Sequence, residues 1–201
     1  MDLVVTNLAV ARGGVAVLAG VNLRLAAGEV LVMRGPNGVG KTTLLRCIAG
    51  LQPALAGSVQ GPPEGMAYAG HADGIKAMLT VRENLEFWAR VYGQGGADAA
   101  LSALNLTALA ERRAADLSAG QKRRLGLARL LVTRRAIWLL DEPTVSLDTA
   151  SVLMFGQVLQ AHQAAGGAAL IATHVDLGLT ARAIDLALYR ARDRALAGVF
   201  G

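Results

Sequence analysis

The feature that most constrains the fold is one short segment, Gly35-Pro36-Asn37-Gly38-Val39-Gly40-Lys41-Thr42. It fits the pattern G-x-x-x-x-G-K-[ST], in which backbone N–H groups and a helix N-terminus converge on phosphate. An apolar run at 30–33 precedes it, and a helical pattern at 42–49 follows. This strand–loop–helix setting favours a phosphate-binding loop over a glycine turn that happens to precede Lys41 and Thr42. Lys41 is expected to reach the outer phosphates, and Thr42 is expected to offer its hydroxyl to Mg²⁺.

Strand and helix patterns alternate along the rest of the chain. Apolar runs predict strands at 3–5, 15–18, 30–33, 66–68, 137–140, 168–172 and, last, 185–189. Helical periodicity predicts helices at 42–49, 81–89, 97–104, from near 119, and at 149–164. Such alternation indicates an α/β fold with a mostly parallel core sheet.

Composition limits the class of protein. With 201 residues, 53% of them hydrophobic, one globular domain with a real core is expected and disorder is excluded. No charged side chain lies between Asp148 and Asp176, but polar residues recur there at helical spacing and Gly166-Gly167 interrupts the stretch, so we predict no membrane span. One of these polar residues, His162, is expected on the polar face of its helix. The start, Met1-Asp2-Leu3, does not resemble a signal peptide. The single Cys47 excludes an intramolecular disulfide and a cysteine-based zinc site.

Two carboxylates follow the apolar run at 137–140. Asp141 would lie at the carboxyl edge of the sheet, beside the phosphate loop, where it can hold the Mg²⁺ shell. Glu142 would face the γ-phosphate and orient the attacking water as a base. Taken alone, this pair also fits an ordinary acidic strand end.

Three further motifs complete a recognisable order. The first is Leu117-Ser118-Ala119-Gly120-Gln121, which predicts a helix capped by Ser118. The second is Val145-Ser146-Leu147-Asp148, and the third is Thr173-His174, which follows an apolar run that predicts a buried strand. Together with the phosphate loop and Asp141-Glu142, these segments resemble the nucleotide-binding subunit of ABC transporters. Leu117–Gln121 is similar to the family signature LSGGQ, with Ala119 in place of the first glycine.

The resemblance implies a P-loop NTPase fold of the ABC type over residues 1–201, with an N-terminal antiparallel β subdomain and a helical subdomain at about 73–118. It implies ATP and Mg²⁺ as cofactors and a head-to-tail homodimer. The expected catalytic residues are Lys41, Glu142 and His174. Thr42, Asp141 and His71 are the expected metal ligands. The expected ATP contacts are Gly35, Pro36, Asn37, Gly38, Val39, Gly40, Lys41, Thr42, Thr43 and Arg12, and, from the second protomer, Ser118, Gly120 and Gln121, with Asp148 joining the protomers.

Two positions depart from the usual family pattern. Arg12 stands where an aromatic residue usually stacks on adenine, and a guanidinium plane can also stack on a base. His71 stands where a glutamine usually contacts Mg²⁺, eight residues before Leu79 in Leu79-Thr80-Val81-Arg82-Glu83-Asn84-Leu85. The imidazole of His71 is expected to bind Mg²⁺ directly or to hold a water molecule there. Alternatively, the contact between this position and Mg²⁺ is weaker than with glutamine.

The chain resembles the ATP-binding subunit of the bacterial haem exporter of cytochrome c maturation in four features. These are Arg12, His71, the chain length and the segment from Tyr68 to Lys76. This implies separate membrane-spanning partners and a peripheral place on the cytoplasmic face of the inner membrane. It further implies hydrolysis coupled to release of a haem-loaded chaperone. No Cys-x-x-Cys-His is present, so we expect no haem site on this chain.

Other functions remain open from the sequence. The same ATP chemistry serves transporters for lipids, drugs or nutrients, because the membrane partner selects the substrate. A non-transport ABC ATPase acting on ribosomes or DNA draws support from the net charge of +5, although aromatic residues are only 4% of the chain. A P-loop kinase or GTPase needs neither the Ser118–Gln121 segment nor His174. We expect no nucleic-acid partner.

Overall fold

The computed structural model describes residues 2–62 and 64–191. Its centre is a five-stranded sheet in the order β5-β6-β7-β3-β8, in which every neighbouring pair is parallel. These strands are β3 (Val30–Arg34), β5 (Met66–Ala69), β6 (Ile137–Asp141), β7 (Ala168–Ala172) and β8 (Arg182–Asp185). A second, antiparallel sheet has the order β2-β1-β4, from β1 (Leu3–Arg12), β2 (Val15–Leu25) and β4 (Ala56–Gln60).

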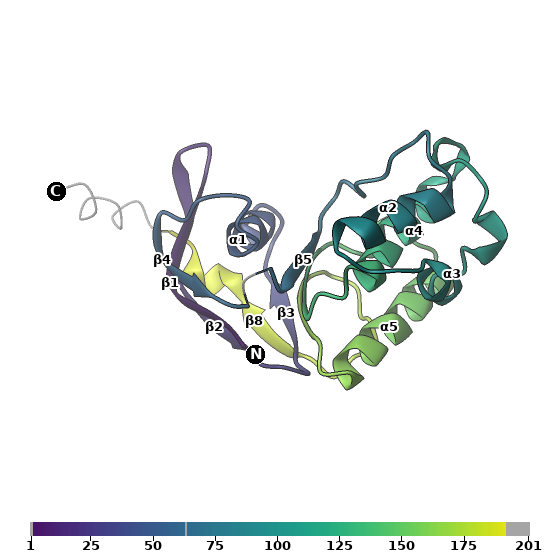
Figure 1. The fold of residues 1–201 in the computed structure, drawn as a ribbon. Helices are drawn as coiled ribbons and strands as arrows, with labels where there is room; N and C mark the ends of the chain where they lie inside the picture. The colour runs from purple at the N-terminus through teal and green to yellow at the C-terminus, as the bar shows by residue number, and fades with distance from the viewer. Residues whose placement is uncertain (1, 63, 192–201) are drawn as a thin grey trace.

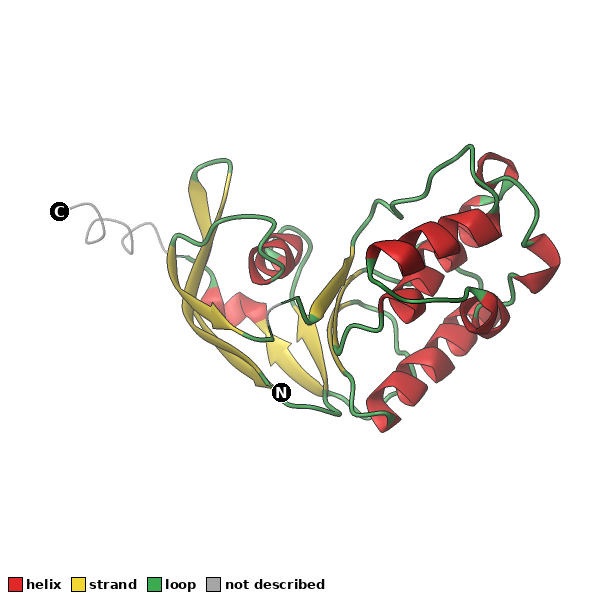
Figure 2. Ribbon diagram, in the orientation of Figure 1, coloured by secondary structure: helices red, strands yellow, loops and turns green. Residues whose placement is uncertain are grey.

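The helices divide between the two faces of the parallel sheet (Figures 1 and 2). Helix α1 (Lys41–Ile48) lies between the parallel and the antiparallel sheet, and helices α2 to α5 lie on the opposite side. Their bounds are α2 (Val81–Val91), α3 (Asp98–Ala103), α4 (Ala119–Thr133) and α5 (Thr149–Ala164). The described residues also form the 3-10 helices η1 (Thr107–Leu109), η2 (Ala114–Asp116) and η3 (Leu186–Tyr189).

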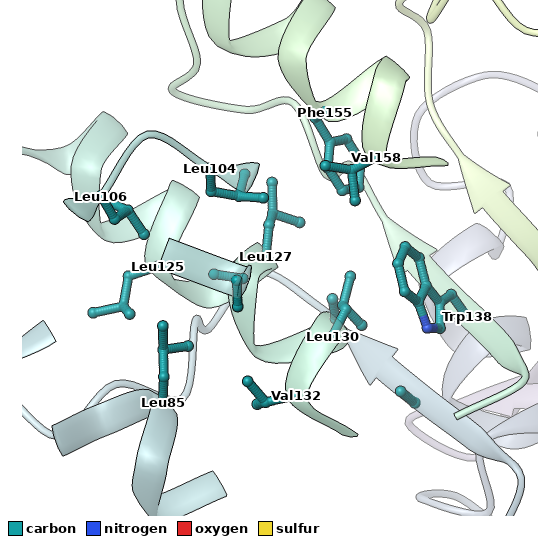
Figure 3. Packing of buried hydrophobic residues seen from close by; sticks show 14 of the residues in the cluster. Leu85, Leu104, Leu106, Leu125, Leu127, Leu130, Val132, Trp138, Phe155 and Val158 are labelled. Carbon is teal, nitrogen blue, oxygen red and sulfur yellow. The ribbon is translucent and has the colours of Figure 1, made fainter. Parts of the chain in front are cut away.

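Alternation along each strand supplies two hydrophobic cores. In β6, Ile137 and Leu139 join the core that contains α1, whereas Trp138 and Leu140 join the core beneath α2 to α5. Figure 3 shows the second core, where Trp138 lies near Val158 of α5 and leucines of α4. All five residues of β6 and of β7 are buried, which is the mark of central strands covered on both faces.

The structure corrects two predictions. The last strand was expected at 185–189, but β8 ends at Asp185, whose carboxylate accepts from the Ala187 N–H at 2.9 Å and starts a 3-10 helix there. His162 was expected on the polar face of its helix, but its ring stacks on Trp138 with centroids 3.7 Å apart. The antiparallel strands β1 and β2 are also longer than the apolar runs that predicted them.

Helices α2 and α3 fall inside the stretch 73–118 that was predicted as a helical subdomain. The predicted ATP-binding domain of 1–201 includes residues 192–201, which lie outside the described residues. Within residues 2–62 and 64–191, no helix has the length and apolar character needed to cross a membrane.

Candidate active site

The phosphate loop connects the end of β3 to the start of α1. Gly35 and Gly40 have a backbone conformation that other residues rarely adopt, with φ of 139° and 116°. A Cβ at Gly40 would also lie 3.1 Å from the side chain of Leu18 in β2. Lys41 is therefore placed as the first residue of α1, with the unpaired N–H groups of the helix N-terminus beside it.

The Lys41 side chain folds back over this loop and is only 7% exposed. Its Nζ donates to the carbonyl oxygen of Gly35 at 2.8 Å and lies 3.1 Å from Nε2 of His174. A lysine ammonium has donors only, so Nε2 of His174 is the acceptor in this contact. The predicted catalytic residues Lys41 and His174, 133 positions apart in the chain, are thus in direct contact.

Asp141 is the last residue of β6 and is 1% exposed. The hydroxyl of Tyr68 in β5 donates to Oδ2 of Asp141 at 3.4 Å. Burial and the negative charge of Asp141 together raise the pKa of Tyr68 to about 12, so the phenol stays protonated and can serve as this donor.

Glu142 begins the turn after β6 in a left-handed conformation, with φ of 47°. Its N–H donates to the carbonyl oxygen of Ala172 at 2.8 Å, which fixes the turn against the end of β7. Its Oε1 lies 3.7 Å from Nε2 of His174. A non-glycine residue held in this backbone region is unfavourable in itself, and such strain often accompanies functional sites.

These groups line one cleft of about 440 Å³ at the carboxyl edge of the parallel sheet. Most of the predicted nucleotide and metal residues share it. The lining residues are Arg12, Val17, Asn37, Gly38, Gly40, Lys41, Thr42, Thr43, His71, Asp141, Glu142 and His174. The loop residue Val39 instead turns its side chain into the core, and Gly35 and Pro36 contribute carbonyl oxygens toward Lys41.

The two unusual residues both reach this cleft. Arg12 is the last residue of β1, is exposed, and lines the cleft together with the phosphate loop. His71 follows β5, and its side chain is 73% exposed. Its Nδ1 lies 3.7 Å from Oδ2 of Asp141, so this imidazole occupies the space between the buried carboxylate and solvent.

The signature segment lies outside the cleft. Ser118 caps α4 as predicted: its Oγ accepts from the Gln121 N–H at 3.2 Å, while Gln121 Oε1 accepts from the Ser118 N–H at 2.9 Å. A Cβ at Gly120 would lie 2.9 Å from the carbonyl oxygen of Ser146, so glycine permits this close approach. Asp148 caps α5, and hydrogen bonds from Ser151 lower the pKa of its carboxyl.

A second hollow of about 240 Å³ lies between the cleft and the signature helix. Ala119 and Lys122 of α4 line it together with Val145 and Ser146. His71 and Glu142 line both this hollow and the cleft, so they lie where the two regions meet.

Sequence reasoning missed one residue of this region. Arg123 of α4 is buried, and its guanidinium lies against the backbone that carries Glu142. One signal was available, because Arg123 shares a helical face with the apolar residues Leu127 and Leu130 at positions i+4 and i+7. A charged residue on an apolar face is rarely buried without partners.

Comparisons with known proteins agree with this geometry. A family model described as ABC transporter matches residues 18–145. The chain belongs to the ABC transporter family. It is therefore an ATP-binding chain of this family, an ABC-type ATPase whose parallel sheet, antiparallel β sheet and helices form a P-loop NTPase fold.

Curated relatives indicate which group within the ABC transporter family this chain belongs to. A "Cytochrome c biogenesis ATP-binding export protein CcmA" from Cereibacter sphaeroides is 66% identical over 192 residues, which cover 95% of this chain and 91% of that protein. A protein of the same name from Ruegeria pomeroyi is 59% identical over 96% of this chain and 94% of its own. The chain thus belongs with these CcmA proteins within the ABC family.

Solved structures share the fold. A putative ABC transporter ATP-binding protein from Pyrococcus furiosus superposes with a TM-score of 0.85 at 24% identity, covering 95% of this chain and 100% of that one. The cbiO1 protein from Clostridium perfringens, part of the ABC transporter complex cbiONQ, gives a TM-score of 0.72 at 27% identity, over 86% of this chain and 78% of that one.

Proposed function

We propose that this chain hydrolyses ATP to drive the export step of cytochrome c biogenesis, coupled to release of a haem-loaded chaperone. The observation that carries the proposal is the cleft that gathers Lys41, Asp141, Glu142 and His174 around the phosphate loop. The names of relatives that are 58–66% identical over nearly the whole chain support the assignment to cytochrome c biogenesis.

In this proposal each residue of the cleft has a role that follows from the chemistry of its side chain. Lys41 and the N–H groups of α1 would bind the outer phosphates, supported by the favourable helix dipole. Glu142 would orient the attacking water as a base, and His174 would contact the γ-phosphate. Arg12, which also lines the cleft, would stack on the adenine through its guanidinium plane.

Mg²⁺ fits the oxygen atoms at the floor of the cleft. Thr42 offers a hydroxyl and Asp141 a buried carboxylate, which are ligands that this ion prefers. No group of three or more His, Cys, Asp or Glu side chains is placed to hold a metal ion among residues 2–62 and 64–191. Phosphate oxygens and waters would therefore complete the shell, and the exposed His71 would hold one such water.

A head-to-tail homodimer would complete the site. Ser118, Gly120, Gln121 and Asp148 do not line the cleft of their own chain. The exposed N-terminus of α4 at Ser118 is suited to a phosphate that approaches from outside the chain. A second copy would bring that helix end to the γ-phosphate, and Asp148 would lie at the contact between the two copies.

The membrane partners would be separate chains at the cytoplasmic face of the bacterial inner membrane. The stretch 73–118 would supply the docking surface, because the large apolar side chain of Met78 is 75% exposed there. Trp88 and Ile75 of the same stretch are partly buried and pack against the core beneath α2 to α5. A transporter of another substrate would use the same ATP site with different membrane partners.

One experiment tests the biological assignment. The chain is purified from its own cells with membranes intact, and the associated proteins are identified. In parallel, cells lacking the gene receive wild type or Glu142→Gln, with Glu86→Gln as control, and covalently bound haem in c-type cytochromes is measured. Wild type and control should restore it, whereas Glu142→Gln should not. Co-purification with a lipid or sugar permease would reject the assignment, and salt-dependent nucleic-acid binding at physiological salt would favour a non-transport ATPase.

A further inference from the structure

Arg123 lies at the junction of three segments: helix α4, the loop after β5 and the turn after β6. The residue is 5% exposed, although its side chain carries a permanent charge. Its Nη1 donates to the Gly70 carbonyl oxygen and to Oδ1 of Asp73, both at 2.8 Å. Its Nη2 donates to the Glu142 carbonyl oxygen at 2.8 Å, and its Nε donates to the Pro143 carbonyl oxygen at 2.9 Å. All three guanidinium nitrogens therefore bind, and they connect α4 to the loop after β5 and to the turn after β6.

The turn after β6 needs such support. Glu142 has the left-handed backbone described above, and a strained residue persists only where its surroundings over-determine it. The strand β7 fixes the N–H of Glu142 from one side, and Arg123 fixes its carbonyl oxygen from the other. The direction of the Glu142 Cα–Cβ bond follows from this backbone, so the two hydrogen bonds together set where the side chain leaves the turn.

The loop after β5 is held on the same face of α4. A Cβ at Gly126 would lie 2.8 Å from the side chain of Asp73, so the loop packs directly on the helix backbone there. Arg129, one further turn along, leaves no room for a Cβ at Gly74. The Trp88 indole N–H donates to the Gly74 carbonyl oxygen at 3.3 Å. Because His71 lies inside this clamped loop, its distance from Glu142 is set through α4.

We propose that Arg123 is a positioning residue for hydrolysis, which holds the Glu142 turn and the His71 loop in one fixed geometry. The proposal rests on the assignment of Glu142 as the base. Only the forked guanidinium can reach these acceptors together, because a lysine presents its donors from a single nitrogen. Displacing a catalytic group by about 1 Å can cost roughly 100-fold in rate.

The test compares Arg123→Lys and Arg123→Met with Arg124→Lys as a matched control. Arg124 is the next arginine of α4, but it donates to Leu104 and Asn105 carbonyl oxygens, away from the cleft. Each variant is assayed for kcat and KM for ATP, for binding of a fluorescent ATP analogue, and for thermal unfolding. Arg123→Lys keeps the charge and most of the volume, so it reports on position even if Arg123→Met fails to fold.

We expect Arg123→Lys to lower kcat by roughly 10- to 100-fold while KM and analogue binding stay within about 3-fold of wild type. Arg124→Lys should keep wild-type kcat. Combining Arg123→Lys with Asp73→Asn should lower kcat by less than the product of the two single effects, because both changes loosen one network. A folded Arg123→Lys protein with wild-type kcat would overturn the proposal, as would equal losses in binding and in kcat. An inactive wild-type chain would instead contradict the proposed function.

Discussion

The ammonium nitrogen of Lys41 lies 3.1 Å from Nε2 of His174, although 133 positions separate the two residues in the chain. The same imidazole nitrogen lies 3.7 Å from Oε1 of Glu142. The phosphate loop, the end of β6 and the segment after β7 thus meet at one histidine. A bound γ-phosphate would compete with His174 and the Gly35 carbonyl oxygen for Lys41, so its arrival would rearrange this contact.

Lys41→Ala is expected to abolish ATP hydrolysis through weaker nucleotide binding. Each hydrogen bond to a charged group contributes about 1.5–3 kcal/mol, which corresponds to roughly a 10- to 100-fold loss of affinity. Equilibrium binding of a fluorescent ATP analogue measures the effect. Lys76→Ala serves as control, because Lys76 lies over the Phe87 ring outside the cleft. Full ATPase activity in Lys41→Ala would reject the phosphate-loop assignment.

Glu142→Gln should retain ATP binding and lose hydrolysis. Removing a general base typically costs about 10²- to 10⁴-fold in rate, whereas the amide keeps the size of the side chain. The variant should therefore accumulate as an ATP-bound dimer, which light scattering with and without ATP measures. Glu86→Gln, whose carboxylate pairs with Arg90 in α2, should behave as wild type. Normal turnover in Glu142→Gln would show that another group orients the water.

His71→Gln should keep ATPase activity within a few-fold of wild type if the position needs only a polar contact. His71 lies 3.7 Å from Asp141 and is largely exposed, so an amide can reach the same region. His71→Ala is the comparison that removes the polar group. Steady-state rates at several Mg²⁺ concentrations measure both. A complete loss in His71→Gln would show that the imidazole has a role of its own.

Ser118→Ala and Thr80→Ala form a matched pair, because both residues cap a helix through the same reciprocal hydrogen bonds. Each change should lower the free energy of unfolding by about 1 kcal/mol. Only Ser118→Ala should also weaken ATP-dependent dimer formation, measured by light scattering in the Glu142→Gln background. Equal dimerisation in both variants would contradict the proposal that Ser118 of one protomer contacts the ATP bound by the other.

The stacked His162 makes stability depend on pH. Burial lowers the pKa of His162 in the folded protein below its ordinary value of 6.5. As pH falls, the imidazole is therefore protonated at a higher pH in the unfolded chain than in the folded protein. The free energy of unfolding should therefore decline below about pH 6.5. His162→Phe keeps an aromatic ring on Trp138 but cannot titrate. Denaturant unfolding between pH 7.5 and 5 should show a smaller decline in this variant, and identical slopes would contradict the assignment.

Sequence motifs indicated which residues lie close together in the cleft better than they indicated the packing around it. Lys41, Asp141 and His174 each follow a motif whose spacing is set by the chemistry of the phosphates, and the structure brings them into one cleft. Local patterns also predicted the Ser118 cap, because such a cap depends on residues within one turn.

Long-range contacts account for what sequence reasoning missed. The partners of Arg123 lie up to 53 positions away, at Gly70, and no local pattern encodes that distance. The His162 ring meets Trp138 only because α5 packs on β6. The 3-10 helix after Asp185 was mistaken for a strand, since a short apolar run cannot be assigned by periodicity alone.

The left-handed backbone of Glu142 has a consequence for how this protein can change. A non-glycine residue in that conformation costs about 1–3 kcal/mol, and glycine would relieve the cost. Folding and turnover therefore favour different residues at this one position. Selection for thermal stability alone would favour replacing Glu142 by glycine, which would give a more stable but inactive protein.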